Sequence, residues 1–491
     1  MKNTRLFTLS MLLIAFVTVH AQNNFYSTSI VKNQINLRAG VTNLGELAIQ
    51  CPAAGYVVVH FDGECYASVG DLIALAASQD GAWHSNDGNV SIENSKPGFG
   101  RPFSHTRVFS VTAGSHTYYA VGENVVERDG SGTATIYGTL SVEYFAETGT
   151  AIVASNGFTF NGDVTNTTVV GQQTIHANGP GKILVRFDGW IESAPGDRIV
   201  LAASNTMSWG FNDGAVAVEA VNAGDVIENS FSHTRVYNVP SAGDYTYYAV
   251  SQNYGKTAGT GEVWVYGNLL TEFFPTAGTE TVAFKGFTLP MIDLNGGPTS
   301  LTTINFTVEE PGKVMLVLDG YSTADTGYTI IVAASLEENY SNNDGSIILK
   351  ALDLDQNRYS FSHTRVYNIS SGPHTFYAVG EITGGNGSKT GDLFGALTMK
   401  YIPFSSTPVT DVSADKNEFD LYPNPTRDEV HISLRNIIDP KNKIKLLDVN
   451  GCLLKEYPYT TELEFKIDLS GLPANQYWVQ IGDQVKLLVK M

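Results

Sequence analysis

Three histidine and arginine pairs are the residues whose types and spacing could do chemistry. The phrase Phe-Ser-His-Thr-Arg-Val, followed each time by Phe or Tyr, occurs three times in the chain. It places the pairs at His105 and Arg107, His233 and Arg235, and His363 and Arg365. Residues two apart share one face of a β-strand, so each imidazole and its guanidinium lie on the same side as aromatic rings. Such a pair needs hydrogen-bond acceptors, and an aspartate is the natural candidate.

Two aspartates recur with each pair. One stands in an Asp-Gly step and the other in an Asn-Asp-Gly step, and the two sets are Asp62, Asp188 and Asp319, and Asp87, Asp213 and Asp344. As a binding site, the rings would stack on a sugar while the Asp, Arg and His side chains bond its hydroxyls. The alternative is a structural network that satisfies a buried carboxylate and fixes the sheet register. The sequence leaves both interpretations open.

The Asn-Asp-Gly steps predict tight turns, because these residues tolerate a positive φ. A calcium loop is the other interpretation, but carboxylates do not recur at the alternating spacing that such loops use. We therefore expect no metal and no cofactor. The chain also lacks a Gly-x-Ser-x-Gly elbow, a His-Glu-x-x-His helix, a Cys-x-x-Cys pair and a phosphate-binding glycine loop. A non-catalytic protein is expected, although the paired acids of a glycosidase meet only in space.

These residues recur because one module is repeated three times. The three histidines are 128 and 130 residues apart, a period that suits a whole domain better than a solenoid repeat of about 20–50 residues. The expected organisation is a signal peptide at 1–21, modules at 22–149, 150–278 and 279–404, a linker at 405–418 and a terminal domain at 419–491.

Within each module, apolar residues alternate with period two. Val57, Val59 and Phe61 alternate with Tyr56, Val58 and His60, which predicts a half-buried strand. Many short β-branched and aromatic runs without an amphipathic helix predict an all-β protein of antiparallel sandwiches or jelly rolls. The layout loosely resembles the jelly rolls of the tumour-necrosis-factor and complement C1q type, which assemble as trimers. That resemblance implies a pseudo-trimer within one chain, and the alternative is three modules in a row.

Charge and targeting signals limit the partners. The 491 residues carry a formal net charge of −19, which disfavours binding to nucleic acid or to an anionic lipid surface. Lys2 and Arg5 precede an apolar run from Leu6 to Val19, which predicts a secretory signal, and no later segment is long enough to span a membrane. In an oxidising compartment Cys51 and Cys65 could form a disulfide.

The last segment resembles the type A C-terminal sorting domain of type IX secretion cargo. Its motif residues stand in the family's order along the whole segment and are Tyr422, Pro423, Asn424, Pro425, Gly451, Tyr477, Lys486 and Lys490. Asn475 and Gln476 stand where the family usually has a glycine. The resemblance implies a small β-sandwich that an outer-membrane translocon recognises, with the passenger then released or attached to the cell surface.

We therefore expect a secreted or cell-surface binding or adhesive protein, with a glycan or surface polymer as its ligand. Weak binding sites repeated along a chain gain affinity through effective concentration. Three equivalent active sites in tandem would instead be unusual. The alternatives are a structural surface or matrix component without a small ligand, and a polysaccharide hydrolase.

Overall fold

The computed structural model contains two compact units, Met1–Phe404 and Ser405–Met491. The first unit is described over residues 24–404 and the second over residues 419–490. The gaps are at 86–87, 94–99, 128–130, 148, 220–226, 255–259, 279, 295–296, 325–326, 342–344, 351–356, 385–389, 423–425, 435–442, 449–452, 458–463 and 482–483. The predicted signal peptide and linker fall outside the described residues.

Module 1 is an eight-stranded jelly roll made of two antiparallel sheets. The inner sheet has the order β1-β8-β3-β6 and the outer sheet the order β2-β7-β4-β5, so consecutive strands belong mostly to opposite sheets. The strands are β1 Asn24–Asn36, β2 Thr42–Cys51, β3 Gly55–Ala67, β4 Asp71–Ser78, β5 Val90–Glu93, β6 Arg101–Val111, β7 Gly114–Glu127 and β8 Thr133–Ala146.

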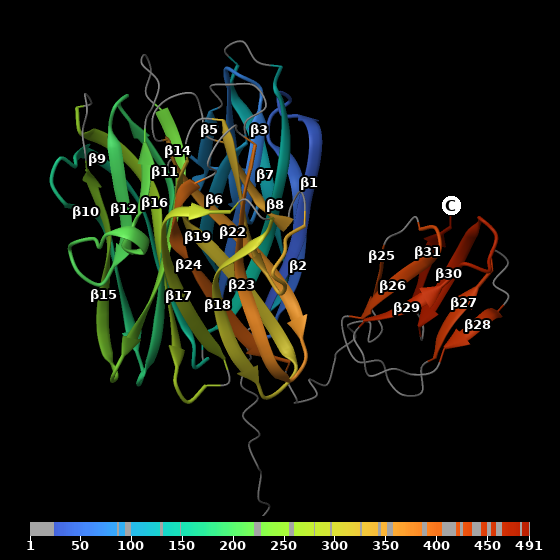
Figure 1. Ribbon diagram of the computed structural model, residues 1–491. Helices are drawn as coiled ribbons and strands as arrows, with labels where there is room; N and C mark the ends of the chain where they lie inside the picture. Colours follow the sequence, from blue (N-terminus) through green and yellow to red (C-terminus); the bar gives the residue numbers. More distant parts are fainter. Residues whose placement is uncertain are drawn as a thin grey trace, which may run out of the picture. The chain divides into compact units, whose positions relative to one another are not determined.

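Modules 2 and 3 repeat this topology. Module 2 consists of β9 Ile152–Asp163, β10 Thr168–Ala177, β11 Gly181–Ser193, β12 Arg198–Ser204, the short 3-10 turn η2 Asn212–Gly214, β13 Val216–Glu219, β14 Ile227–Val239, β15 Gly243–Asn253 and β16 Glu262–Pro275. Module 3 consists of β17 Thr281–Asp293, β18 Thr299–Val308, β19 Gly312–Ala324, β20 Tyr328–Ser335, β21 Ile347–Lys350, β22 Asn357–Ile369, β23 Gly372–Gly384 and β24 Thr390–Pro403. The all-β prediction of three homologous sandwiches is confirmed (Figure 1).

The central strand of each inner sheet is buried on both faces. On β3, Val57, Val59 and Phe61 fill the core of module 1, while Val58 and His60 on the other face are only 4% and 3% exposed. Tyr56, at the start of the strand, is 38% exposed as predicted, but for the rest of β3 the prediction of a half-buried strand was wrong. Its second face packs against the neighbouring modules, which alternation within one strand cannot show.

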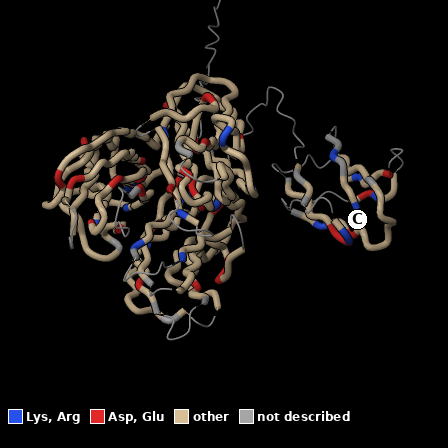
Figure 2. Tube along the Cα trace, turned by 90° about the horizontal axis from the view of Figure 1, so that it is seen from above, with Lys and Arg blue, Asp and Glu red and all other residues tan. Residues whose placement is uncertain are grey.

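The three modules form a closed ring. Hydrogen bonds join modules 1 and 2 through Ser104 and Asp188, and modules 3 and 1 through Ser362 and Asp62. The backbone N–H of Ser232 in module 2 donates to the hydroxyl of Ser360 in module 3. Seen from above, the first unit has three lobes, with charged residues between the lobes as well as on their rims (Figure 2). The modules therefore surround a common axis and are not arranged in a row.

The recurring Asp-Gly step has a backbone cause on the inner sheets. Gly63 and Gly189 have φ of +153° and +147°, a region that side chains rarely adopt. A Cβ at Gly63, Gly189 or Gly320 would lie 2.1 Å from a carbonyl oxygen of the neighbouring strand. Glycine is thus required at this position in every module.

The predicted disulfide is not formed. Cys51 and Cys65 are free, buried thiols in the core of module 1. Cys51 ends β2 close to the start of β3, and Cys65 lies near the far end of β3. At about 3.3 Å per residue, β3 carries Cys65 about 33 Å from Gly55, whereas a disulfide needs Cα atoms within about 7 Å.

The second unit is a small sandwich of two sheets, in the orders β25-β26-β29 and β28-β27-β30-β31. Its core includes Phe419, Val430, Ile444, Tyr477 and Leu488. The strands are β25 Phe419–Tyr422, β26 Glu429–Leu434, β27 Ile444–Leu447, β28 Leu453–Tyr457, β29 Glu464–Asp468, β30 Gln476–Ile481 and β31 Gln484–Val489.

Candidate functional site

The aspartates of the Asp-Gly steps accept hydrogen bonds across the module boundaries. Asp62 accepts from Ser362 at 3.1 Å and from Thr364 at 2.8 Å, both on β22 of module 3. Asp188 accepts from Ser104 at 3.2 Å and from Thr106, on β6 of module 1. Asp319 of module 3 is hydrogen-bonded to Thr234 on β14 of module 2. The Ser-x-Thr positions of the recurring phrase thus link each module to the next.

The histidines of the phrase point to the other face and bridge the two sheets of their own module. Nδ1 of His105, His233 and His363 accepts the backbone N–H of Ala77, Ala203 and Ala334 at 2.9, 2.9 and 3.0 Å. In module 1, β5 pairs with β4 only from Leu72 to Leu75, so the imidazole receives an N–H beyond the end of that pairing. A neutral imidazole that accepts at Nδ1 carries its proton on Nε2.

The arginines of the phrase are half-buried, and two of them lie beside aromatic rings. The Arg235 guanidinium lies 5.1 Å from the ring centre of Phe284 in module 3, and that of Arg365 lies 5.9 Å from Tyr367. Arg107 Nη1 lies close to Gly88. Arg235 therefore lies at a module boundary, whereas Arg107 and Arg365 contact residues of their own modules. All three lie on the strand face opposite to the Ser-x-Thr hydroxyls that bond the aspartates.

His60 connects two of these aspartates close to the axis. Its Nε2 lies 3.2 Å from Asp62 and its Nδ1 lies 2.7 Å from the Thr106 hydroxyl and 3.8 Å from Asp188. Burial alone would raise the pKa of Asp62, but the charge and hydrogen bond of His60 hold it below the usual value. Burial dominates elsewhere: it raises the pKa of Asp188, and it raises that of Asp319 to about 7.

A lysine and two glutamates form a second buried layer at the same position of the three modules. Lys400 on β24 donates to Glu143 on β8 and to Glu272 on β16, the latter at 2.9 Å. All three side chains are at most 4% exposed. Burial lowers and the two carboxylates raise the pKa of Lys400, and its net shift is upward. The lysine is thus held as a cation that offsets the two acids.

Glu64 lies where module 1 meets module 3. It is 1% exposed, and its Oε2 accepts the backbone N–H of Ile348 at 3.3 Å. Burial raises its pKa to about 8, since the hydrogen bond from Tyr66 and the charge of Lys350 offset only part of the desolvation.

The Glu64→Gln variant is expected to remove a pH-dependent loss of stability. The folded pKa of about 8 lies above the ordinary 4.5, so the contribution of Glu64 is full below pH 4.5 and is lost as the pH rises to about 8. At about 1.4 kcal/mol per pKa unit, the original protein should lose up to several kcal/mol relative to the variant. Urea unfolding at about pH 5, 7 and 9 measures this difference. Parallel pH curves for the two proteins would contradict the buried placement of this carboxyl.

Each module also carries a half-exposed aromatic ring bonded to an acceptor on the neighbouring strand, a set that the sequence analysis missed. Trp83 donates to Glu123 at 2.5 Å, Trp209 to Gln252 at 2.8 Å and Tyr340 to Glu381 at 2.5 Å. We call these the three aromatic pairs. Each ring stands five positions after the Ser of an Ala-Ala-Ser step, a signal that could have found them. The acceptor is a glutamate in modules 1 and 3 and Gln252 in module 2, and an amide oxygen accepts the same hydrogen bond as a carboxylate.

Module 2 extends its aromatic pair into an exposed cluster. The ring of Trp209 lies 4.9 Å from that of Phe211 and 5.5 Å from that of Tyr254, measured between ring centres. Phe211 is 68% exposed and Tyr254 47% exposed. The inner side of Trp209 packs on Val200 and Ala202 of β12. The outer sheet therefore supports an aromatic surface that faces solvent.

The predicted Asn-Asp-Gly turns are described in part. Asn212 has a φ of +62° and begins η2, as expected for a tight turn. The side chain of Asp213, and residues Asp87 and Asp344, lie outside what is described. In the described part of the chain, no group of three or more His, Cys, Asp or Glu residues is placed to hold a metal ion.

In the second unit, the described motif residues have structural contacts. Tyr422 pairs with His431, and the Tyr477 hydroxyl donates to Pro473 at 2.6 Å. Lys486 lies over the ring of Phe419, and the buried Lys490 donates to the carbonyls of Leu469 and Leu472, both at 2.7 Å. Pro423, Asn424, Pro425 and Gly451 lie outside the described residues.

Three jelly rolls followed by a terminal sandwich define an all-β passenger with its own terminal domain. Residues 420–491 match the family described as the secretion system C-terminal sorting domain, so the expected type IX secretion tail is confirmed. Such a tail implies interaction with the type IX machinery and export to the cell surface or the exterior. No helix in the described residues has the length and apolarity to cross a membrane.

No curated protein sequence matches the chain. Among solved structures, the triple jelly roll of an archaeal virus is 10% identical, with 79% of this chain and 92% of that chain covered and a TM-score of 0.20. The infectious bursal disease virus VP2 particle is 12% identical, with 78% and 82% covered and a TM-score of 0.19. The Endo-D glycoside hydrolase domain of Streptococcus pneumoniae R6 is 13% identical, with 43% and 37% covered and a TM-score of 0.13. Likeness this low supports no inference about function.

Proposed function

We propose that the chain is a secreted or surface-displayed, non-catalytic protein that binds glycans at its three aromatic pairs. The observation that carries the proposal is the recurrence of a half-exposed ring, fixed by a hydrogen bond, in every module. The predicted His, Arg and Asp set offers less support, because its histidines and Asp-Gly aspartates are buried in module cores and boundaries.

The chemistry of the aromatic pairs suits a sugar. An indole or phenol face stacks on the apolar face of a pyranose, and an adjacent carboxylate or amide bonds the hydroxyls at the rim. The hydrogen bond to Glu123, Gln252 or Glu381 holds the ring in one orientation. Three such sites on one rigid ring would each bind weakly and would together bind a polymer more tightly, through effective concentration.

The middle pair argues against shared acid catalysis. Gln252 replaces the glutamates of the other two modules, and an amide cannot exchange a proton as a general acid or base. The conserved property is therefore hydrogen-bond acceptance beside a ring, which serves binding.

A glycan array with the purified full-length protein tests the proposal. We expect binding to a subset of neutral glycans, and a drop of about tenfold or more in the double variant Phe211→Ser with Tyr254→Ser, since stacking on one ring is worth about 0.5–1.5 kcal/mol. Both rings are exposed, so the thermal midpoint should stay within about 1–2 °C of the original.

Trp264→Ser provides the matched control, because Trp264 is another exposed ring, 43% exposed, on β16 of the same module. Binding should survive in this control. Binding that is unchanged in the double variant would overturn the assignment to module 2, and release of reducing sugar would instead favour a hydrolase.

A structural surface or matrix component is the second candidate. The observation that favours it is the use of the recurring aspartates and hydroxyls to join modules, which gives a rigid body without requiring a ligand. An array with no glycan bound above background would favour this candidate over the first.

A further inference from the structure

A pocket opens where the three modules meet. Its cavity volume is about 10 Å³, room for about one water-sized molecule, and it is lined from β6 of module 1, β14 of module 2 and β22 of module 3, with β5 and β13 beside them. Arg101, Asn229 and Tyr359 hold equivalent positions there, since they pair with the third residue after the Asp-Gly aspartate in each module. The pocket therefore depends on the complete ring.

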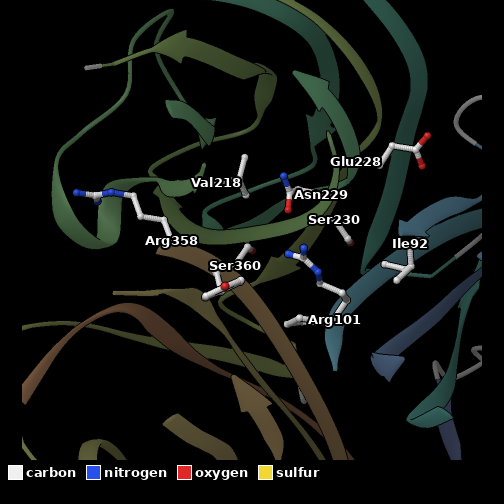
Figure 3. A pocket seen from close by; sticks show the side chains of 10 residues that line it. Ile92, Arg101, Val218, Glu228, Asn229, Ser230, Arg358 and Ser360 are labelled. Atoms are coloured by element: carbon white, nitrogen blue, oxygen red, sulfur yellow. The ribbon is translucent and has the colours of Figure 1, made fainter. Parts of the chain in front are cut away.

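Its polar groups are mainly donors. The Arg101 guanidinium lies between Asn229 and Ser360 in Figure 3, and it also lies 5.8 Å from the ring centre of Tyr359. Among the described residues, Asn229 Nδ2 is a buried donor of this lining without a hydrogen-bond partner. A buried donor without a hydrogen bond costs about 1–3 kcal/mol, so an acceptor that reaches Asn229 Nδ2 beside Arg101 would stabilise the ring.

The charge of the lining favours one negative charge. Arg101, with one positive charge, is the charged lining residue whose side chain points inward. Glu228 and Arg358 point away to opposite sides of the pocket, while Arg101 points inward (Figure 3). A cation inside this pocket would face Arg101 directly, whereas a monovalent anion would neutralise the lining.

We propose that this pocket binds a small monovalent anion, either a halide or a single carboxylate group, and that the bound anion links the three modules. Arg101 supplies the charge, and Asn229 Nδ2 supplies a further donor. The acidic passenger repels anions at long range. Salt at 0.1 M largely screens that repulsion between charges more than about 10 Å apart. The site should therefore fill at moderate salt concentrations.

Thermal unfolding of the full chain tests this proposal, with chloride, acetate and gluconate as sodium salts at equal ionic strength. Gluconate, a six-carbon anion much larger than a space for about one water-sized molecule, serves as the reference salt. Chloride or acetate should raise the midpoint by about 1–2 °C at ten times its dissociation constant. The anion with the larger effect identifies the source, a halide or a carboxylate.

The variants Arg101→Gln and Asn229→Leu should lose this specific rise, whereas Arg427→Gln, an exposed arginine of the second unit, should retain it. If Arg101→Gln does not fold, anomalous scattering from crystals of the original protein grown with bromide gives an independent answer, and a peak beside Arg101 is expected. Equal effects of all three salts in the original protein and in both variants, or no bromide peak, would show that only water occupies the pocket and would overturn the proposal.

Discussion

Replacing Lys400 with methionine is expected to lower the free energy of unfolding of the first unit by about 3–5 kcal/mol at neutral pH. The substitution leaves Glu143 and Glu272 buried at the axis without their cation. The loss should shrink as the pH falls toward the ordinary glutamate value of 4.5, because protonated carboxyls are easier to bury. Urea unfolding at several pH values measures the effect.

Lys285→Met is the matched control, since Lys285 is an exposed lysine on β17 of the same module and should change stability by less than about 0.5 kcal/mol. Adding Glu143→Leu and Glu272→Leu to Lys400→Met should restore most of the loss, because an apolar layer needs no cation. A Lys400→Met protein as stable as the original would show that these three side chains do not meet at the axis.

The second large effect is expected for Gly189→Ala. The new Cβ would lie 2.1 Å from the carbonyl oxygen of Tyr266 and 2.8 Å from the Cα of Gly267, and the φ of +147° is strained for any side chain. Because both close atoms belong to the backbone of β16, no rotamer change relieves the contact. We expect a loss of about 3 kcal/mol or more, or failure to fold.

Gly179→Ala in the same module is the comparison, since its Cβ would meet no heavy atom within 4 Å. This variant should unfold within about 0.5 kcal/mol of the original. Equal stability of the two alanine variants, measured by urea unfolding, would refute the close approach of β11 and β16.

The fold class followed from the sequence because strand periodicity and turn residues are local signals. The repeat also identified the right positions, since Asp62, His105 and their counterparts all have specific contacts. Their partners could not be predicted, because Asp62 bonds a strand some 300 residues away and His105 bonds a backbone N–H. Neither contact leaves a local pattern in the sequence.

The axial layer shows a different limit of the repeat comparison. Glu143, Glu272 and Lys400 are equivalent positions that differ in type, so a search for residues repeated three times passes over them. In a ring that closes within one chain, the three positions meet once and need to complement each other. The aromatic pairs were missed for a related reason, because the property retained at Gln252 is hydrogen-bond acceptance rather than residue identity.

The most direct test of the account is the number of binding sites per chain. A glycan that binds on the array would be titrated by calorimetry into the full-length protein and into the triple variant Trp83→Ala, Trp209→Ala and Tyr340→Ala. The thermal midpoint of the variant checks that it is folded. Our account predicts up to three equivalents bound per chain and none in a folded triple variant. Full binding by that variant would contradict it.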